Sequence, residues 1–86
     1  KLVYSVGPDG LPDGDLKRYF QNGNLEVHSI FVNGKRNGFQ KEYYESGEIR
    51  KDMNYVNDLL HGEQKQFNTD GSLSGNSNFD NGTRLN

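Results

Sequence analysis

Residues 38–61 read GFQKEYYESGEIRKDMNYVNDLLH, and this stretch decides the fold because its pattern recurs on both sides. Residues 14–37 read GDLKRYFQNGNLEVHSIFVNGKRN, and residues 62–85 read GEQKQFNTDGSLSGNSNFDNGTRL. Aligned at Gly14, Gly38 and Gly62, the three blocks agree in seven columns without a gap, so the chain is built from a 24-residue unit. The other six columns are Lys17, Lys41 and Lys65; Tyr19, Tyr43 and Phe67; Gly23, Gly47 and Gly71; Leu25, Ile49 and Leu73; Phe31, Tyr55 and Phe79; and Asn33, Asn57 and Asn81.

The repeat organises residues 1–86 as one repeat domain. We assign residues 14–37, 38–61 and 62–86 to units one, two and three, and residues 1–13 to a partial unit. Asp9-Gly10 echoes Asn33-Gly34, so residues 1–6 are expected to form the strand before unit one. Asn86 stands where another phase-setting glycine is expected, which predicts that the natural array is longer.

Inside each unit the order of signals is strand, turn, strand, turn. Asn22-Gly23, Ser46-Gly47 and Asp70-Gly71 are hairpin dipeptides between short runs of β-type composition. The run after the first turn alternates, with Leu25, Val27, Ser29 and Phe31 expected on one side, and a wider connection at 33–38 leads to the next hairpin. The prediction is an all-β fold, a single-layer twisted antiparallel sheet of tandem β-hairpins.

The turn residues also select a hairpin type. A two-residue type I′ turn needs positive φ at both central positions, which Ser46 disfavours. A type I turn followed by a left-handed glycine and a bulge needs positive φ only at Gly23, Gly47 and Gly71. We predict the bulged loop, which places Tyr19 opposite Leu25 and repeats that pairing in the later units.

The repeated apolar columns are expected to pack along one face. One unit buries only a few large side chains, at roughly 1.5–3 kcal/mol each, against about 1–2 kcal/mol of backbone entropy per ordered residue, so stability has to come from stacking the units. Gly14, Gly38 and Gly62 either leave room for a neighbouring aromatic ring to cross the backbone or merely end the preceding turn. The predicted core consists of Tyr19, Leu25, Phe31, Tyr43, Ile49, Tyr55, Phe67, Leu73 and Phe79.

A second group of apolar residues is expected on the other face of units one and two. The matching positions of unit three are polar, so the repeat pattern by itself does not explain why units one and two have apolar residues there. Such a patch indicates either an interaction surface or a second, thin layer of internal packing. The candidate binding residues are Phe20, Ile30, Val32, Tyr44 and Val56.

Composition excludes several classes of function. Leu, Ile, Val and Phe supply 20 of the 86 residues, just above the level of about 20% below which chains tend toward disorder, so a thin core is expected. The net charge is −2 with dispersed basic residues, which argues against a nucleic-acid partner, and no apolar run is long enough for a transmembrane segment. These totals leave the localisation open.

The chain shows no catalytic constellation and no metal site. It has no cysteine, and its two histidines stand at non-equivalent positions without a ligand cluster. Asn76, Asn78 and Asp80 alternate like the start of a calcium loop, but Asn81 occupies the place of the turn glycine. We therefore expect neither an enzyme nor a cofactor.

The columns G-x-x-K-x-Y-x-x-x-G-x-L, followed by a spaced aromatic and Asn-Gly, resemble the MORN repeat. The pattern is most similar to the bacterial MORN-variant repeat of the YwqK-type antitoxin family, over residues 14–86, with Asp58 and Asn68 as departures. The resemblance implies an elongated array of hairpins that serves as a scaffold or binding surface. Partners implied for such repeats are proteins, membrane lipids and, for antitoxin-like members, a cognate toxin.

The leading hypothesis is therefore a non-catalytic protein–protein interaction module or scaffold. One alternative is a structural spacer in a longer exported or surface repeat protein, and another is a lipid- or glycan-binding hairpin array. Open sheet edges also predict end-to-end self-association through the edge strands.

Overall fold

The computed structural model describes residues 1–85, and within that range every regular element is a β-strand. The all-β prediction is confirmed. The strands are β1 (Leu2–Val6), β2 (Pro12–Tyr19), β3 (Leu25–Val32), β4 (Lys35–Tyr43), β5 (Ile49–Val56), β6 (Leu59–Leu60), β7 (Gly62–Phe67), β8 (Leu73–Asp80) and β9 (Thr83–Arg84).

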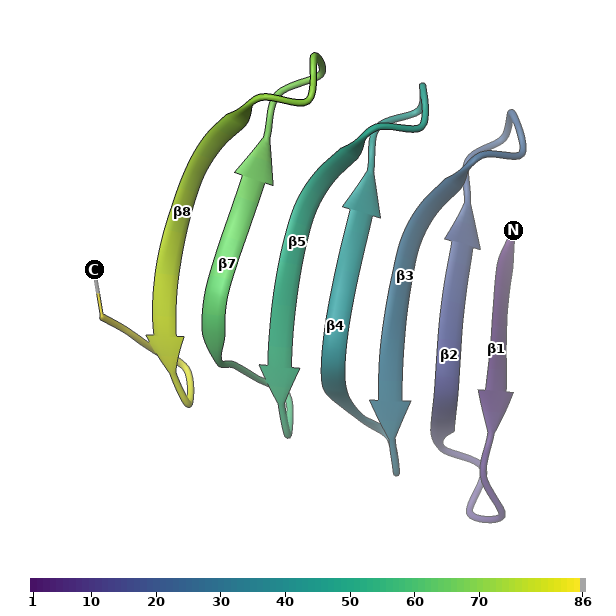
Figure 1. Cartoon of the computed structure of the whole chain (residues 1–86). Helices are drawn as coiled ribbons and strands as arrows, with labels where there is room; N and C mark the ends of the chain where they lie inside the picture. Colours follow the sequence, from purple (N-terminus) through teal and green to yellow (C-terminus); the bar gives the residue numbers. More distant parts are fainter. Residues whose placement is uncertain (86) are drawn as a thin grey trace.

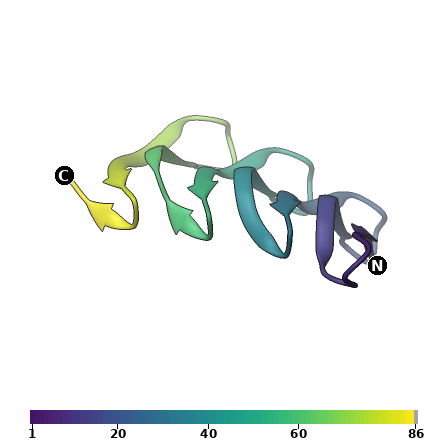
Figure 2. The same ribbon diagram turned by 90° about the horizontal axis from the view of Figure 1, so that it is seen from below.

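All strands belong to one antiparallel sheet in which chain neighbours are spatial neighbours. The order is β1-β2-β3-β4-β5-β7-β8-β9, and β6 pairs with β5 beside β7. Figure 1 shows the long strands side by side from the N-terminal to the C-terminal end. The described chain measures 41 × 36 × 11 Å, and Figure 2 shows that no second layer covers the sheet.

The hairpin tips adopt the predicted bulged turn. Gly23 N–H donates to the Phe20 carbonyl at 3.0 Å, and Phe20 N–H donates to the Asn24 carbonyl at 2.8 Å. Gly23, Gly47 and Gly71 have φ of 93°, 109° and 90°. Asn22, Ser46 and Asp70 are absent from the residues with positive φ, as a type I turn with a following left-handed glycine requires.

The connections between units are tighter than expected. Asn33 and Gly34 both have positive φ, 51° and 84°, as in a two-residue type I′ turn, and β4 begins directly afterwards at Lys35. The wider connection expected at 33–38 is therefore wrong. Gly34 N–H also donates to the Pro12 carbonyl at 2.8 Å, which ties this turn to the preceding unit.

Asp58 takes the place of glycine in the corresponding turn of unit two. Its φ is 69°, a region that aspartate tolerates better than most residues, and its N–H donates to the Arg36 carbonyl at 2.8 Å. The Asp58 carboxylate accepts the Arg36 N–H at 2.8 Å and the Arg36 Nε–H at 3.3 Å. The backbone N–H of Arg36 lowers the pKa of Asp58, so its charged form is favoured in the fold.

A bulge in each hairpin divides the apolar columns between the two faces. Tyr19 pairs with Leu25, but Arg18 pairs with Val27. Paired residues share a face and successive residues alternate, so Leu25 and Val27 lie on opposite sides. We name the side of Arg18 and Val27 the front face and the side of Lys17 and its partner His28 the back face.

This corrects the expectation that the core columns share one side. At the hairpin-tip end the apolar pairs lie on the back face, while at the other end the aromatics lie on the front face. Tyr55 is the buried hydrophobic residue, 9% exposed, whereas Leu73 of the weaker third unit is 53% exposed. By register, Tyr19, Leu25, Tyr43, Ile49, Phe67 and Leu73 belong to the back face, and Phe31, Tyr55 and Phe79 to the front face.

Gly14, Gly38 and Gly62 lie directly opposite Phe31, Tyr55 and Phe79 in the ladder, and each has positive φ. A Cβ on Gly38 would meet Ile30 rather than a ring, and one on Gly62 would meet nothing within 4 Å. The backbone kink, rather than space for an aromatic, is what requires glycine here.

The N-terminal strand follows the repeat with a slip of one residue. In the repeat, Val3 corresponds to Val27 and Arg18 to Glu42, and β3 pairs Val27 with Glu42. An exact repeat would therefore pair Val3 with Arg18, but β1 pairs Leu2 with Arg18. The loop after β1 is a bulged turn, because Gly10 N–H donates to the Gly7 carbonyl at 3.0 Å and only Gly10 of the Asp9-Gly10 pair has positive φ. The echo of Asn33-Gly34 therefore does not extend to the turn type.

The junction between units two and three is closed by a side chain. Gln64 is 8% exposed, and its Oε1 accepts the Asn54 N–H at 2.7 Å. Its Nε2 donates to the carbonyls of His61 at 3.1 Å and Gly62 at 3.0 Å. The amide thus satisfies backbone groups where β5 changes partner from β6 to β7.

Candidate binding grooves

The five residues predicted to form one apolar patch are divided between the two faces. Phe20 and Tyr44 directly follow Tyr19 and Tyr43, so alternation places them on the front side. Ile30, Val32 and Val56 are on the back side, since each is adjacent to a front-face residue. Among the five, only Val32 belongs to the exposed large hydrophobics, at 44%. The structure therefore does not bring this set together as a continuous surface.

Tyr44 instead links two units. Its Oη donates to the Phe67 carbonyl at 2.7 Å from a half-buried position. At the hairpin tips, the side-chain amides of Asn22 and Asn24 both donate to the Glu45 carbonyl, at 3.2 and 2.8 Å. These bonds fix the spacing of neighbouring hairpins and hence the shape of the front face between them.

The front face is hollowed in two places. The unit-one groove has a volume of about 390 Å³. Its arginines are paired with carboxylates: Arg18 Nε with Glu26 at 3.1 Å, Arg50 with Glu42 at 2.6 Å and Arg36 Nε with Asp58 at 3.3 Å. It is lined by Leu2, Leu16, Arg18, Glu26, Val27, Ser29, Phe31, Arg36, Gln40, Glu42 and Arg50.

The unit-three groove is larger, at about 470 Å³, within the range typical of ligand sites. Gly75 and Ser77 on β8 supply little bulk, and a Cβ on Gly75 would meet nothing within 4 Å. The groove is lined by Lys51, Met53, Leu60, Gln64, Lys65, Gln66, Gly75, Asn76, Ser77, Phe79 and Arg84.

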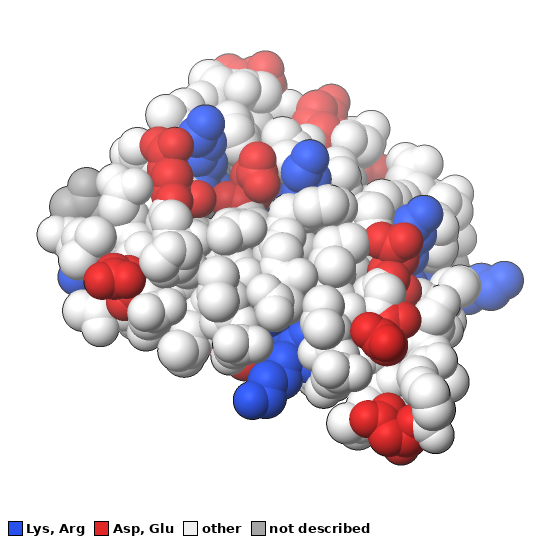
Figure 3. All heavy atoms as spheres, turned by 60° about the horizontal axis from the view of Figure 1, so that its bottom comes forward, with Lys and Arg blue, Asp and Glu red and all other residues white. Residues whose placement is uncertain are grey.

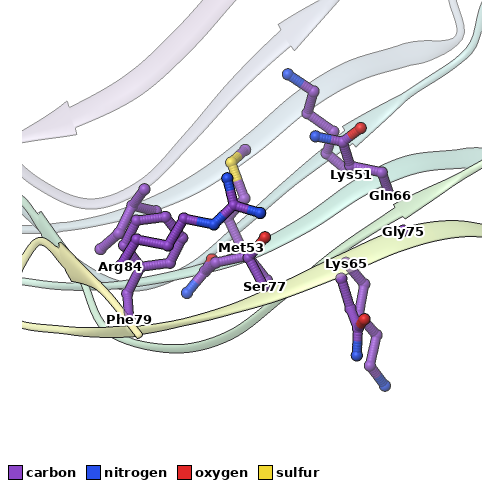
Figure 4. Close-up of a pocket in the computed structure, with 11 residues that line it drawn as sticks. Lys51, Met53, Lys65, Gln66, Gly75, Ser77, Phe79 and Arg84 are labelled. Carbon is purple, nitrogen blue, oxygen red and sulfur yellow. The ribbon is translucent and has the colours of Figure 1, made fainter. Parts of the chain in front are cut away.

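The side chains of the unit-three groove have distinct positions. Figure 4 shows Lys51 and Gln66 toward one end and Met53, Phe79 and Arg84 toward the other. Lys65 projects away from these residues, in agreement with its register partner Asp52 on the back face. None of the lining residues is acidic, and Lys51 is the cation at the end of the groove near Gln66.

Charge elsewhere is mixed rather than concentrated. On the side of the molecule seen in Figure 3, acidic and basic side chains are interspersed and most of the surface is uncharged. Two exposed turn carboxylates have lowered pKa values, Asp70 through the Ser72 hydroxyl and Glu48 through the Ser46 hydroxyl. These bonds stabilise the hairpin tips.

The back face holds one compact polar cluster. His28 Nε2 lies 2.9 Å from Asp15 Oδ1, and its ring meets Phe39 edge-on with centroids 5.0 Å apart. Lys41 Nζ lies 5.2 Å from the centroid of the Phe39 ring. Within residues 1–85, no group of three or more His, Cys, Asp and Glu side chains could hold a metal ion.

Sequence reasoning missed the grooves because it assumed strict alternation through each hairpin. The bulges place Glu26 and Arg50 on the front face, where they form the ion pairs beside the unit-one groove. One signal was available: Gly75 replaces Val27 and Lys51 in the repeat column, and it lies inside β8 rather than in a turn.

The comparisons with known proteins identify the repeat. The family model described as MORN repeat variant matches residues 12–33, 36–57 and 60–81, whose starts are spaced by the same 24 residues. No curated protein and no solved structure gives a significant match. In the described range no helix is long and apolar enough to cross a membrane.

Proposed function

This chain belongs to the MORN repeat variant family, and from that membership we propose that it is a non-catalytic module that binds another protein on the front face of its sheet. MORN repeats are consistent with a binding or scaffold module. The observation that carries the proposal is the pair of grooves on one face, each beside an aromatic of the repeat, Phe31 or Phe79. A single-layer sheet leaves both grooves open to a partner.

The chemistry of the front face supports a binding role rather than catalysis. Glu26 and Glu42 are each held in an ion pair with an arginine, so neither is positioned as a general base. The most buried polar side chains, Ser29 and Gln64, are 3% and 8% exposed, and Gln64 serves the backbone. Paired charges and polar groups with satisfied hydrogen bonds are typical of the polar part of a protein–protein interface.

A matched pair of substitutions on β3 tests the proposal, because Val27 and His28 are adjacent and face opposite sides. Val27→Lys introduces the residue that unit two has in the same column, Lys51, and His28→Asn introduces that of unit three, Asn76. We expect Val27→Lys to reduce capture of the protein partner and His28→Asn to leave it unchanged. Quantitative capture followed by direct binding of the purified partner measures this.

Equal capture by both variants would exclude the unit-one groove as the binding site and leave the unit-three groove as the candidate on the front face. If wild type captured no protein at all, a structural spacer would account for the chain. Tight binding to lipid vesicles or glycans in place of protein would favour the hairpin-array alternative. A narrower form of the proposal, taken from the resemblance to YwqK-type antitoxins, makes the partner a toxin, and neutralisation of a co-expressed toxin would test it.

Self-association through an edge strand is a second proposal. The side chains of β1 are exposed apolar groups, with Leu2 at 53%, Tyr4 at 48% and Val6 at 56%. Within residues 1–85, β1 pairs only with β2, so its outer backbone groups can accept another strand. Tyr4→Lys should lower the apparent mass in light scattering if β1 joins two copies, and an unchanged mass would exclude this edge.

A further inference from the structure

We propose that the unit-three groove anchors an extended peptide segment that carries an acidic side chain next to an apolar one. The carboxylate would pair with Lys51 at one end of the groove. The apolar side chain would lie against Met53 and Phe79. This inference rests on the proposed protein-binding function and specifies which partner surface the groove recognises.

The charge of the groove selects an anion. Within residues 1–85 Lys51 forms no ion pair, although Glu42 stands opposite it in the ladder, because the Glu42 carboxylate is bound to Arg50 at 2.6 Å and to Gln40 at 3.1 Å. Arg84 lies at the other end of the groove, opposite Phe79 in the ladder. In the unit-one groove, by contrast, each arginine has a carboxylate partner: Arg18 pairs with Glu26, Arg50 with Glu42 and Arg36 with Asp58. An acidic group is therefore favoured in unit three alone.

The shape of the groove results from departures from the repeat. The ion pair of Arg18 and Glu26 in unit one corresponds to Gln66 and Ser74 in unit three. These two side chains are uncharged and shorter. Gly75 stands where units one and two have Val27 and Lys51. Its backbone does not require glycine, because its φ lies outside the positive region. The groove is thus open because of side-chain loss and not because of a turn.

The remaining lining groups suit a peptide better than a free anion. Gln66 and Ser77 present an amide and a hydroxyl, which bond main-chain N–H and C=O groups. Met53, Leu60 and Phe79 give an apolar wall large enough for one side chain. No second layer of the described chain covers this face of the sheet (Figure 2), so a longer segment can pass over it. Gln64 also lines the groove, and its amide is already satisfied by backbone groups.

Two substitutions separate loss of binding from loss of folding. Gly75→Val fills the groove with the residue of unit one, and it should raise the melting temperature because valine favours a strand and no atom lies within 4 Å of the new Cβ. Lys51→Glu reverses the charge at one end. Lys17→Glu makes the same charge change on the back face and is the matched control.

The probe is a phage-displayed library of random peptides selected on the immobilised chain. We expect enrichment of Asp or Glu beside a large apolar residue, and binding of the selected synthetic peptides that weakens as salt is raised. Lys51→Glu should weaken binding by about tenfold or more, the scale of one charge-assisted hydrogen bond. Gly75→Val should abolish binding while the protein remains folded, and Lys17→Glu should leave it unchanged.

The other outcomes overturn the inference in distinguishable ways. Selected peptides without acidic residues, or peptides insensitive to Gly75→Val and Lys51→Glu, refute the anchoring site but leave protein binding in place. Failure to select any peptide, together with no capture of a protein partner, removes both proposals. Binding of anionic lipid vesicles that depends on Lys51, with no peptide selected, reassigns the groove to a membrane surface.

Discussion

Replacement of Gln64 by methionine tests how the units are joined. Methionine keeps the length and most of the volume of glutamine but removes its hydrogen-bonding groups. The Asn54 N–H, bonded to Gln64 Oε1 at 2.7 Å, loses its partner. The carbonyls of His61 and Gly62 lose a donor at 3.1 and 3.0 Å. These groups lie where β5 exchanges one partner strand for the next, so no ladder bond replaces them directly.

The magnitude follows from the number of bonds. Each hydrogen bond contributes about 0.5–1.5 kcal/mol net, and an unsatisfied buried donor costs about 1–3 kcal/mol. The loss of these bonds should therefore lower the free energy of unfolding by about 2–4 kcal/mol. For a chain of this size each kcal/mol corresponds to about 4–8 °C in Tm, so a decrease of about 10–25 °C is expected. Small domains have a total stability of about 5–15 kcal/mol, which makes this a large effect.

Gln40→Met is the matched control, because Gln40 occupies the same column as Gln64 but, among the described residues, its side chain bonds only to Glu42, at 3.1 Å. Urea unfolding followed by circular dichroism measures both variants, and amide hydrogen exchange locates the loss. We expect protection to fall at Asn54 and across β7 and β8, and to persist in β3 and β4. Equal destabilisation by the two substitutions would refute the role given to the Gln64 amide.

Four further predictions follow from single contacts. Tyr44→Phe should cost about 0.5–1.5 kcal/mol through loss of the bond to the Phe67 carbonyl, while Tyr43→Phe, the control, should leave Tm unchanged. Gly47→Ala should destabilise the fold by about 1–2 kcal/mol, because φ of Gly47 is 109° and alanine disfavours positive φ. Gly75→Ala, at a residue without positive φ, should leave the stability unchanged or raise it. Equal effects of the two substitutions in thermal unfolding would contradict the turn assignment. Asp58→Ala should lower Tm more than Asp58→Gly, since glycine retains the positive φ and only alanine adds backbone strain to the lost carboxylate. Asp58 and Asp70 have pKa values below the ordinary aspartate value, so in acid the unfolded chain binds more protons than the folded chain. The stability that these carboxylates contribute above about pH 4 should therefore be lost as the pH falls through their folded-state pKa values. Asp70→Asn should reduce this pH dependence, which a pH series of melting curves measures.

The turn chemistry was predictable because it is local. Ser46 disfavours positive φ, so the hairpin tips had to use the glycine that follows, and the observed φ of Gly47 agrees. Asn33-Gly34 is the same kind of local signal for a type I′ turn, yet the wider connection was expected there instead. The type I′ turn became evident from the φ angles of both residues and from the bond between Gly34 N–H and the Pro12 carbonyl.

The faces were not predictable, because a bulge is a relation between two strands. Leu25 and Val27 are two residues apart, and period two alone assigns them to the same side. The ladder pairs them with Tyr19 and Arg18, which are adjacent, and so separates them. Every later position of the strand keeps its own alternation, and for this reason Phe31 and Tyr55 fall on the front face while Tyr19 and Tyr43 fall on the back.

By itself the sequence determined the repeat, the all-β class and the position of each hairpin tip, since these depend on residue spacing and on the conformational limits of single residues. Only the tertiary structure decided which side chains meet. The unit-three groove exists because β5, β7 and β8 lie together with Gly75 between bulkier neighbours, and Lys51 is left without that carboxylate because Glu42 is bound to Arg50. Such contacts depend on the register between strands and on which of several possible partners a side chain binds. The repeated residues of the sequence contain no information on either.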